Sequence, residues 1–514
     1  MTLDTPAYQP HLSPNIAQVI NNKDYQEFRS TLEQIDEILV KGKIEAEFVD
    51  LSLEQKLHEL TRSPLEQETS GPKAGSSVKP SRRWMNRWQK TARKALRCNI
   101  ARKLLGGSFR KFSDRLADSA LLQWFCLIDQ LAVIRTPTKS TLDRFDKIVP
   151  DSIIQQVTDR ATIKAMEPGT SSEDQPLGLV QPITIDQAFI DTSCIKANIH
   201  FPVDWVLLRD VVIRLVGMIV VIRKHGLIHR MPSPESFLRQ INKLCLEMTH
   251  TRRKKNAKKE RKRILRLMKE LVKKVNAHAE RYRDLLVGNW SQTDLSEKEK
   301  DYLLKRLSKV LELLPQAVKQ AHERIIGGRQ VNNKDKILSL HETEIHILVR
   351  GKSGAEVEYG NTWVIVEQED GIIIYSKLIK DQAKADCYLV QPALEQIART
   401  FGSYPGELGG DRGFDSEEVR VFISENEIYN GVCPRSPEML KERLKEERFR
   451  QSQKRRSQTE GRIGIIKNRF LDGTLRSKGF LHRQLGVAWA ILAHNLWALA
   501  RLAIAQKEEL AAAA

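Results

Sequence analysis

Three acidic residues lie in local contexts that suit metal-dependent chemistry on a phosphodiester. Asp191 lies in the β-like run AFIDTSC, Asp411 in the glycine-rich GGDRGFDS, and Glu460 in RRSQTEGRIGIIKNRF. Carboxylates from separate elements are the ligands that hard divalent ions prefer. Two such ions, about 3.5–4 Å apart, can activate an attacking oxygen and stabilise a leaving oxygen. The chain has 65 acidic residues, so Asp186 stays an alternative to Asp191, and Asp415 an alternative to Asp411.

Two basic residues accompany Glu460 at helical spacing. Arg456 precedes it by four positions and Lys467 follows it by seven. On a helix, positions 456, 460, 464 and 467 share one face, which would then carry a carboxylate for metal and two cations for phosphates. An ordinary salt bridge between Arg456 and Glu460 is the competing interpretation.

The hydropathy pattern predicts the elements that must position these residues. Alternation and β-branched residues in 183–202 predict a first strand. Helical periodicity then continues for more than a hundred residues before β-like segments return. We expect strands within 344–379, two of which form a hairpin around EQEDG. A helix at 384–401 and a strand that ends in 406–416 follow. The last elements are expected to be a helix at 416–425, a strand at NGVCPRS and helix from about Pro437 onward. This order predicts a mixed α/β fold that is interrupted after its first strand.

The interruption, residues 205–335, is predicted to be helical and in part strongly basic. Residues 251–283 hold fifteen Lys and Arg against three acids, with Leu and Val at helical spacing. We expect a helical hairpin with one basic arm. Either it contacts DNA, or it is a solvated spacer.

The N-terminal third is predicted to be helical in two parts. Residues 1–69 form the first part, and the Gly-, Pro- and Ser-rich segment 70–81 is a linker. Residues 82–103 hold nine Lys and Arg and no acid, and Trp84 and Trp88 share one helical face. We interpret 82–150 as a basic helical DNA-binding region, in which Arg82, Arg83 and Arg87 contact phosphates; the alternative is a solvated helix with core tryptophans. Residues 151–180 are expected to form a loop.

Overall composition narrows the class of protein. The chain has 514 residues and a formal net charge of +19, which favours a polyanionic partner such as nucleic acid or an anionic membrane. Its 41% hydrophobic content argues against wholesale disorder. The six cysteines are scattered without a C-x-x-C pair, which argues against a zinc ribbon or a disulfide framework and suits a reducing cytoplasm.

No membrane-targeting segment is expected. The N-terminus shows no signal peptide. The apolar stretch 485–505 is long enough to span a bilayer, but His494, Asn495 and Arg501 interrupt it, so we predict a buried core helix.

Four passages give the chain a family resemblance. DTSCIKANIHFPVD resembles a first-aspartate strand, and GGDRGFDS resembles a second-aspartate motif. The R-x3-E-x6-K segment at Arg456, Glu460 and Lys467 resembles the R-E-K part of a Y-R-E-K signature. STLDRF at 140–145 resembles the end of an N-terminal helical domain. Together these passages resemble the motifs of bacterial insertion-sequence transposases with a ribonuclease-H-like DDE catalytic domain. The chain is most similar to the ISNCY-type group, over about residues 82–505.

The resemblance implies a fold and a reaction. The fold would be α/β, with a ribonuclease-H-like mixed sheet formed by 183–204 and 340–505, a helical insertion at 205–335 after the first strand, and an all-α N-terminal domain before it. Asp191, Asp411 and Glu460 would hold two Mg²⁺ ions, for which Mn²⁺ would substitute. Water would cleave the phosphodiester at the transposon end, and the freed 3′-OH would attack target DNA.

Further residues take roles by the same resemblance. Arg456, Lys467 and Arg412 would position phosphates, and the group Asn198, His200 and Asp204 would lie around the metal ligands. The partners would be double-stranded DNA, as inverted-repeat ends and as target, and a second copy of the chain bound to that DNA. The protein would act on the nucleoid in a bacterial cytoplasm, without a membrane.

One departure and three competing functions stay open. The signature's tyrosine falls at Gln453, which leaves the recognition of transposon ends in doubt. The chain could instead be an inactive DNA-binding relative, a ribonuclease-H-like nuclease that does not join strands, or a membrane-surface protein. The last of these gives no reason for the ordered acidic motifs.

Overall fold

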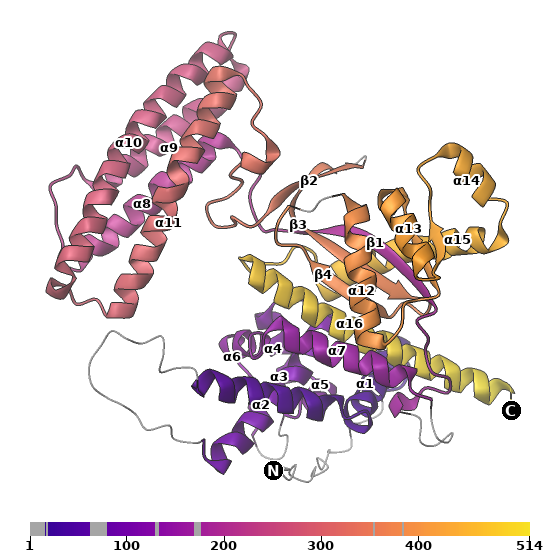
Figure 1. Ribbon diagram of the computed structural model, residues 1–514. Coiled ribbons are helices and arrows are strands. Elements are labelled where there is room, and N and C mark those ends of the chain that lie inside the picture. The colour runs from indigo at the N-terminus through magenta and orange to yellow at the C-terminus, as the bar shows by residue number, and fades with distance from the viewer. Residues whose placement is uncertain are drawn as a thin grey trace.

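A mixed sheet, a protruding group of helices and an N-terminal group of helices make up the protein in the computed structural model (Figure 1). The structure describes residues 16, 19–61, 80–128, 133–168, 176–352, 355–382 and 385–513. The predicted linker 70–81 therefore lies almost entirely outside the described residues. A mixed α/β architecture with a helical N-terminal region, as predicted, is confirmed.

Six strands form the sheet in the described part of the chain. They are β1 (Gln187–Lys196), β2 (His346–Lys352), β3 (Ala355–Gln368), β4 (Ile373–Leu378), β5 (Glu407–Gly410) and β6 (Tyr429–Val432). The order is β2-β3-β1-β5-β6, with β4 also paired to β3. The long strand β3 is antiparallel to β1, β2 and β4, whereas β1, β5 and β6 run parallel. The predicted β3–β4 hairpin around EQEDG is confirmed, because its strands pair directly on either side of that turn.

Helices cover both faces of the sheet. Ala188 and Ile190 of β1 pack into one apolar cluster with α12 (Val390–Phe401) and α13 (Glu417–Glu425). The opposite face is covered by α15 (Glu447–Ile465) and α16 (Phe480–Ala513), with the short α14 (Pro437–Arg443) before them. Because side chains of a strand alternate between the two faces, Phe189, Asp191 and Ser193 point toward the α15 side.

Helix α16 is the predicted core helix of the C-terminal region, and this prediction is confirmed. It contacts β4 and three N-terminal helices, so it joins the sheet to the N-terminal part (Figure 1). Its length and composition would also suit a membrane span, but 72% of its most apolar window is buried within the protein. Asn495 is fully buried and both donates to and accepts from the backbone of Ile373 in β4. Asn495, one of the polar residues that interrupt the apolar stretch, therefore holds α16 to the sheet.

Seven helices form the N-terminal part in the described residues. They are α1 (Lys23–Lys41), α2 (Ile44–Thr61), α3 (Arg82–Leu105), α4 (Phe109–Asp118), α5 (Ala120–Phe125), α6 (Lys139–Asp146) and α7 (Asp151–Met166). The expected loop at 151–180 is wrong for its first half, which is α7. Ile153, Val157 and Ala161 recur at four-residue spacing and bury one face of this helix. The Pro-, Gly- and Ser-rich residues that follow it gave the segment its loop-like composition.

The basic helix α3 is balanced by acids from other helices. Its second half is buried in the core, where Arg97 is 1% exposed and pairs with Glu45 and Asp36. Arg102 pairs with Asp146 of α6. The first three turns present Arg82, Arg83, Arg87 and Lys90 to solvent. The lack of acids within 82–103 thus reflects partners that lie far away in the sequence.

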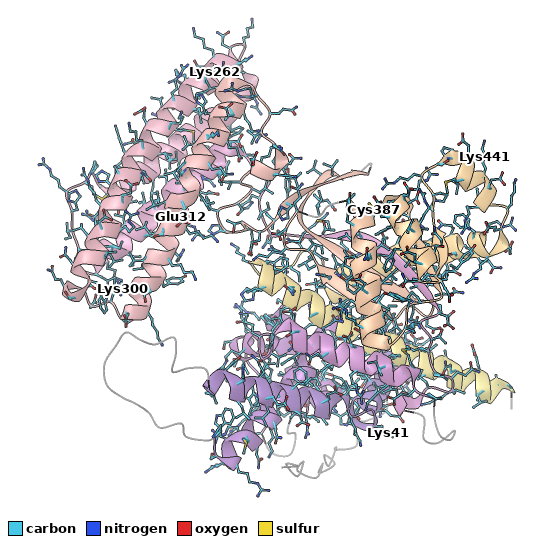
Figure 2. The ribbon with its side chains drawn as sticks, viewed as in Figure 1. Lys41, Lys262, Lys300, Glu312, Cys387 and Lys441 are labelled. Atoms are coloured by element: carbon cyan, nitrogen blue, oxygen red, sulfur yellow. The ribbon has the colours of Figure 1, made fainter. Side chains whose placement is uncertain are left out.

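The insertion between β1 and β2 has its own hydrophobic core. It consists of α8 (Asp204–Lys224), α9 (Pro234–His250), α10 (Ala257–Asn289) and α11 (Glu297–Ala321). The expected helical hairpin is present as α10 and α11, and α8 and α9 pack against it to complete a group of four helices. Apolar residues on all four helices exclude water between them, which requires more than two helices for a closed core. Lys262 and Lys300 lie at opposite ends of this group (Figure 2).

Candidate active site

Parallel pairing of β1 with β5 brings Asp191 and Asp411 to the same level of the sheet. The register pairs Phe189 with Gly409, so Asp191 and Asp411 are both two residues further along. Strand β5 ends at Gly410, and Asp411 continues in an extended conformation. Neighbouring strands are about 4.8 Å apart, and residues at equal register point to the same face. The two carboxylates that the sequence singled out are therefore neighbours on the α15 face.

Two glycines let α15 approach this face closely. A Cβ on Gly409 would lie 2.6 Å from the ring of Phe189, and a Cβ on Gly431 of β6 would lie 2.4 Å from Oγ of Ser452 in α15. Any larger residue at these positions would push the helix away from the sheet. The glycines of GELGG and NGV thus determine how near α15 lies to the two aspartates.

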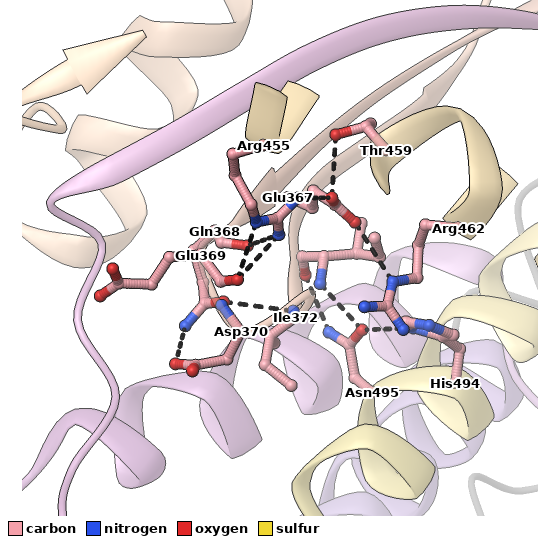
Figure 3. A network of polar contacts seen from close by, with 11 residues as sticks. Glu367, Gln368, Glu369, Asp370, Ile372, Arg455, Thr459, Arg462, His494 and Asn495 are labelled. Carbon is pink, nitrogen blue, oxygen red and sulfur yellow. Dashed lines mark hydrogen bonds and ion pairs between the residues drawn. The ribbon is translucent and has the colours of Figure 1, made fainter. Parts of the chain in front are cut away.

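A buried carboxylate on β3 fixes the position of α15 along the sheet (Figure 3). Glu367 is fully buried and accepts from Nη1 of Arg455 at 2.8 Å, from Oγ1 of Thr459 at 2.8 Å and from Nε of Arg462 at 3.3 Å. These three donors recur at helical spacing on α15. Sequence reasoning missed this network, although a single acid inside the apolar strand TWVIVEQ is a detectable signal.

Glu460 lies on the adjacent, solvent-facing side of α15. Its side chain is 61% exposed, and Nη1 of Arg456 lies 3.5 Å from its carboxylate. The predicted i,i+4 contact is therefore present, but exposed pairs of this kind contribute little to stability. Glu460 and Lys467 line one cavity of about 420 Å³ together with Ser193 and Lys196 of β1. Lys467 lies in the π-helical turn Ile466–Phe470 that follows α15, and its Nζ donates to Oγ of Ser193 in β1 at 3.2 Å.

The electrostatics link Asp191 to both other acids. Burial is the largest cause that raises the pKa of Asp191, to about 6; repulsion from Asp411 and Glu460 raises it further, while a hydrogen bond from the backbone of Thr192 and the charge of Arg456 lower it. Burial and neighbouring negative charges favour the protonated form of this carboxyl group. A bound cation would favour its ionised form and offset the repulsion between the acids.

Local contacts separate the two aspartates of the GGDRGFDS motif. Asp411 accepts from the backbone N–H of Gly413 through Oδ1 at 2.8 Å. Asp415 is buried, pairs with Arg420 and accepts from the backbone N–H of Arg435. Asp415 therefore stabilises the turn, and Asp411 is the residue available for chemistry.

Position relative to β1 distinguishes Asp186 from Asp191. Asp186 is exposed and precedes β1, where its backbone carbonyl accepts from Glu407 at the start of β5. It lies five residues before Asp191, or about 16 Å along a strand. The structure thus favours Asp191 over the alternative that the sequence left open.

The donor set suits Mg²⁺ in chemistry. Asp191, Asp411 and Glu460 supply oxygen ligands only, as a hard cation requires. Within the described ranges, no group of three Asp, Glu, His or Cys side chains is gathered tightly enough to hold a metal ion. The two aspartates are adjacent, and the carboxylate of Glu460 is directed to Arg456 instead.

The other predicted site residues lie elsewhere. Asp204 is buried at the start of α8 and accepts from Gln320 and Arg324 of the insertion. Asn198 and His200 line a cavity between the end of β1 and the insertion. These residues follow Lys196, which is already about 16 Å along the strand from Asp191. Arg412 is exposed beside Asp411, where it can reach a bound phosphate.

Gln453, which replaces the signature's tyrosine, fastens α15 to the strand ends. Its side-chain amide donates to the carbonyls of Gly410 at 3.3 Å and Gly431 at 2.6 Å. The side chain of Gln453 therefore contacts β5 at Gly410, the residue that precedes Asp411.

We expect Gln453→Ala to lower the free energy of unfolding by about 1–2 kcal/mol, because two strand-end carbonyls lose their donor. Denaturant unfolding measures the change. Gln451→Ala, which removes only an exposed contact to Glu447, is the matched control. Equal effects of the two substitutions would show that Gln453 does not fasten the helix.

Comparisons with protein-family models, with curated proteins and with solved structures find no match to this chain. The six cysteines are free thiols, as the sequence predicts.

Proposed function

We propose that the chain is a bacterial insertion-sequence DDE transposase, which binds the inverted-repeat ends of its element, cleaves them and joins them to target DNA. The observation that carries the proposal is the register of β1 and β5, which sets Asp191 beside Asp411 on the face that α15 crosses with Glu460. A sheet in which β1 lies between antiparallel β3 and parallel β5 supports a ribonuclease-H-like fold. The resemblance of the three motifs supplies the reaction.

The roles of the residues follow from where they lie. Asp191, Asp411 and Glu460 would hold Mg²⁺, or Mn²⁺ in its place, which when bound supplies an activated oxygen and a stabilised leaving group. Lys467 and Arg456 flank Glu460 and would hold phosphates of the DNA near the acids. Glu367, Gln453 and the two glycines keep α15 at the distance from the sheet that this requires.

The partners follow from charge and from the reaction. A net charge of +19 supports double-stranded DNA as the substrate. Joining two ends requires that both be held at once, which supports a homodimer on DNA. Free thiols support a reducing cytoplasm, with the protein bound to the nucleoid.

The test is an assay of cleavage and strand transfer on labelled DNA that carries the repeats flanking the gene. With Mg²⁺ we expect 3′-end cleavage and a joined product, and with EDTA we expect neither. Cleavage without joined product would favour a nuclease. DNA binding without cleavage would favour an inactive relative and contradict the proposal.

A further inference from the structure

A basic cavity of about 750 Å³ lies between the N-terminal helices and the segment that follows α15. It is lined from one side by α3, by the turn before α4 and by α6, and from the other by residues 470–478. Four of its exposed cations, which come from both sides, are Arg110, Lys139, Arg476 and Lys478. In the part of the chain that the structure describes, no ion pair joins these four to a carboxylate. Three acids line the cavity: Asp143 and Asp146 are paired with Lys147 and Arg102, and Asp472 is exposed beside the Gly106 turn. The lining still holds seven Lys and Arg against these three acids.

The turn before α4 presents backbone donors to this cavity. Gly106 and Gly107 have φ of +70° and +92°, a conformation that favours glycine. Ser108 then caps α4, and the first turn of this helix holds no acid. The N–H groups at a helix start have no partner within the helix and attract anions. A Gly-Gly-Ser turn that opens into a cationic cavity suits a phosphate.

Lys103 adds a buried cation behind the turn. It is 4% exposed, lines the cavity and donates to the carbonyl of Gly486. Burial lowers its pKa to about 7. An ammonium has three donors, so this contact leaves donor capacity, and an anion in the cavity would favour its charged form.

The cavity adjoins the candidate active site, because two residues line both. Leu471 and Thr474 line both this cavity and the smaller one that holds Glu460 and Lys467. At the turn itself, an added Cβ on Gly106 would lie 3.5 Å from the backbone carbonyl of Arg469. The cations therefore form a track from Lys467 to the turn before α4, which we call the phosphate track: Lys467, Arg476, Lys478, Arg110 and Lys139.

We propose that the phosphate track binds the sugar–phosphate backbone of duplex DNA, with a phosphate at the turn formed by Gly106, Gly107 and Ser108, and so guides the strand that enters the candidate active site. This inference rests on the proposed function for the identity of the ligand. It adds the α3–α4 turn to the exposed first turns of α3 as an N-terminal DNA contact, because the basic residues in the second half of α3 are largely buried or paired. Phosphate contacts hold the register of a duplex without reading its sequence.

The experiment measures binding of a labelled random-sequence duplex as a function of salt, by fluorescence anisotropy. Each phosphate contact contributes about 0.9 to the slope of log K against log salt. We expect Arg476→Gln with Lys478→Gln to reduce this slope by about two, and Arg110→Gln to reduce it by about one. The control is Lys23→Gln with Lys41→Gln on α1, which removes the same charge from another surface and leaves the slope within about 0.5 of wild type.

Each outcome decides the inference. All exchanged residues are exposed, and circular dichroism checks that the variants fold. A wild-type slope in both track variants, or an equal loss in the α1 control, would overturn the track. Wild-type protein without salt-dependent DNA binding would overturn the track and the transposase proposal together. Protein that shows the expected slopes but never cleaves its ends would leave the track in place and contradict only the proposed activity.

Discussion

Asp191→Asn is expected to reduce cleavage by roughly a thousandfold or more and, without metal, to make the folded protein more stable. The loss follows because the amide removes a charged metal ligand beside Asp411. The gain follows because burial and the two neighbouring acids raise the pKa of Asp191 to about 6, above its ordinary value. Above pH 6 the folded state therefore carries a carboxylate that it disfavours. One pKa unit corresponds to about 1.36 kcal/mol, and the pKa rises from 3.8 to about 6, so the gain is about 3 kcal/mol near pH 8.

The upward direction of the pKa shift of Asp191 determines how this gain in stability depends on pH. Because the folded pKa is raised, the protonated side chain stabilises the wild type below about pH 4, and this contribution is lost as the pH rises through 6. The difference between Asp191→Asn and wild type should thus vanish near pH 4 and be complete above pH 7. Denaturant unfolding across this range in EDTA measures it.

Two controls separate this prediction from a general effect of charge. Asp186→Asn changes an exposed carboxylate just before β1 and should alter neither cleavage nor stability. Glu460→Gln should abolish cleavage with little gain in stability, since its side chain is 61% exposed. Cleavage that survives Glu460→Gln would remove this residue from the ligand set. An Asp191→Asn protein that is less stable at pH 8 would contradict the electrostatic description of the site.

Glu367→Gln is expected to destabilise the sheet and α15 by about 3–5 kcal/mol. The substitution keeps the shape of the side chain but leaves Arg455 and Arg462 without their buried counter-charge. Because Glu460 is carried by the same helix, we also expect cleavage to fall even where the variant stays folded. Hydrogen exchange of α15 and denaturant unfolding measure the first effect, and the cleavage assay measures the second.

The neighbouring Glu369 offers a matched control for Glu367. Glu369 is exposed, and among the residues that the structure describes its carboxylate accepts one hydrogen bond, from Oγ1 of Thr184. Glu369→Gln should change stability by less than about 0.5 kcal/mol. A loss below about 1 kcal/mol in Glu367→Gln, or unchanged exchange in α15, would show that the buried network does not hold the helix.

The sequence by itself determined most of the strands and helices of the sheet region, and the places of Asp191 and Asp411 relative to their strands. Alternation predicted β1 and the β3–β4 hairpin, and glycine placed Asp411 at a strand end, because strand periodicity and turn chemistry are local properties. The apolar stretch around His494 and Asn495 was correctly predicted as a core helix, since polar interruptions cost too much in lipid. Local pattern failed at α7, where loop-like residues after the helix masked its four-residue spacing.

Only the tertiary structure decided which charges are available. Arg97 and Arg102 belong to a segment without acids, yet Glu45, Asp36 and Asp146 from other helices pair with them. Glu367 reaches Arg455 across 88 residues of sequence, and Asp191 meets Asp411 across 220. Whether a charge is buried, paired or open to DNA depends on neighbours that no local window contains, because desolvation and Coulomb attraction act through space rather than along the chain.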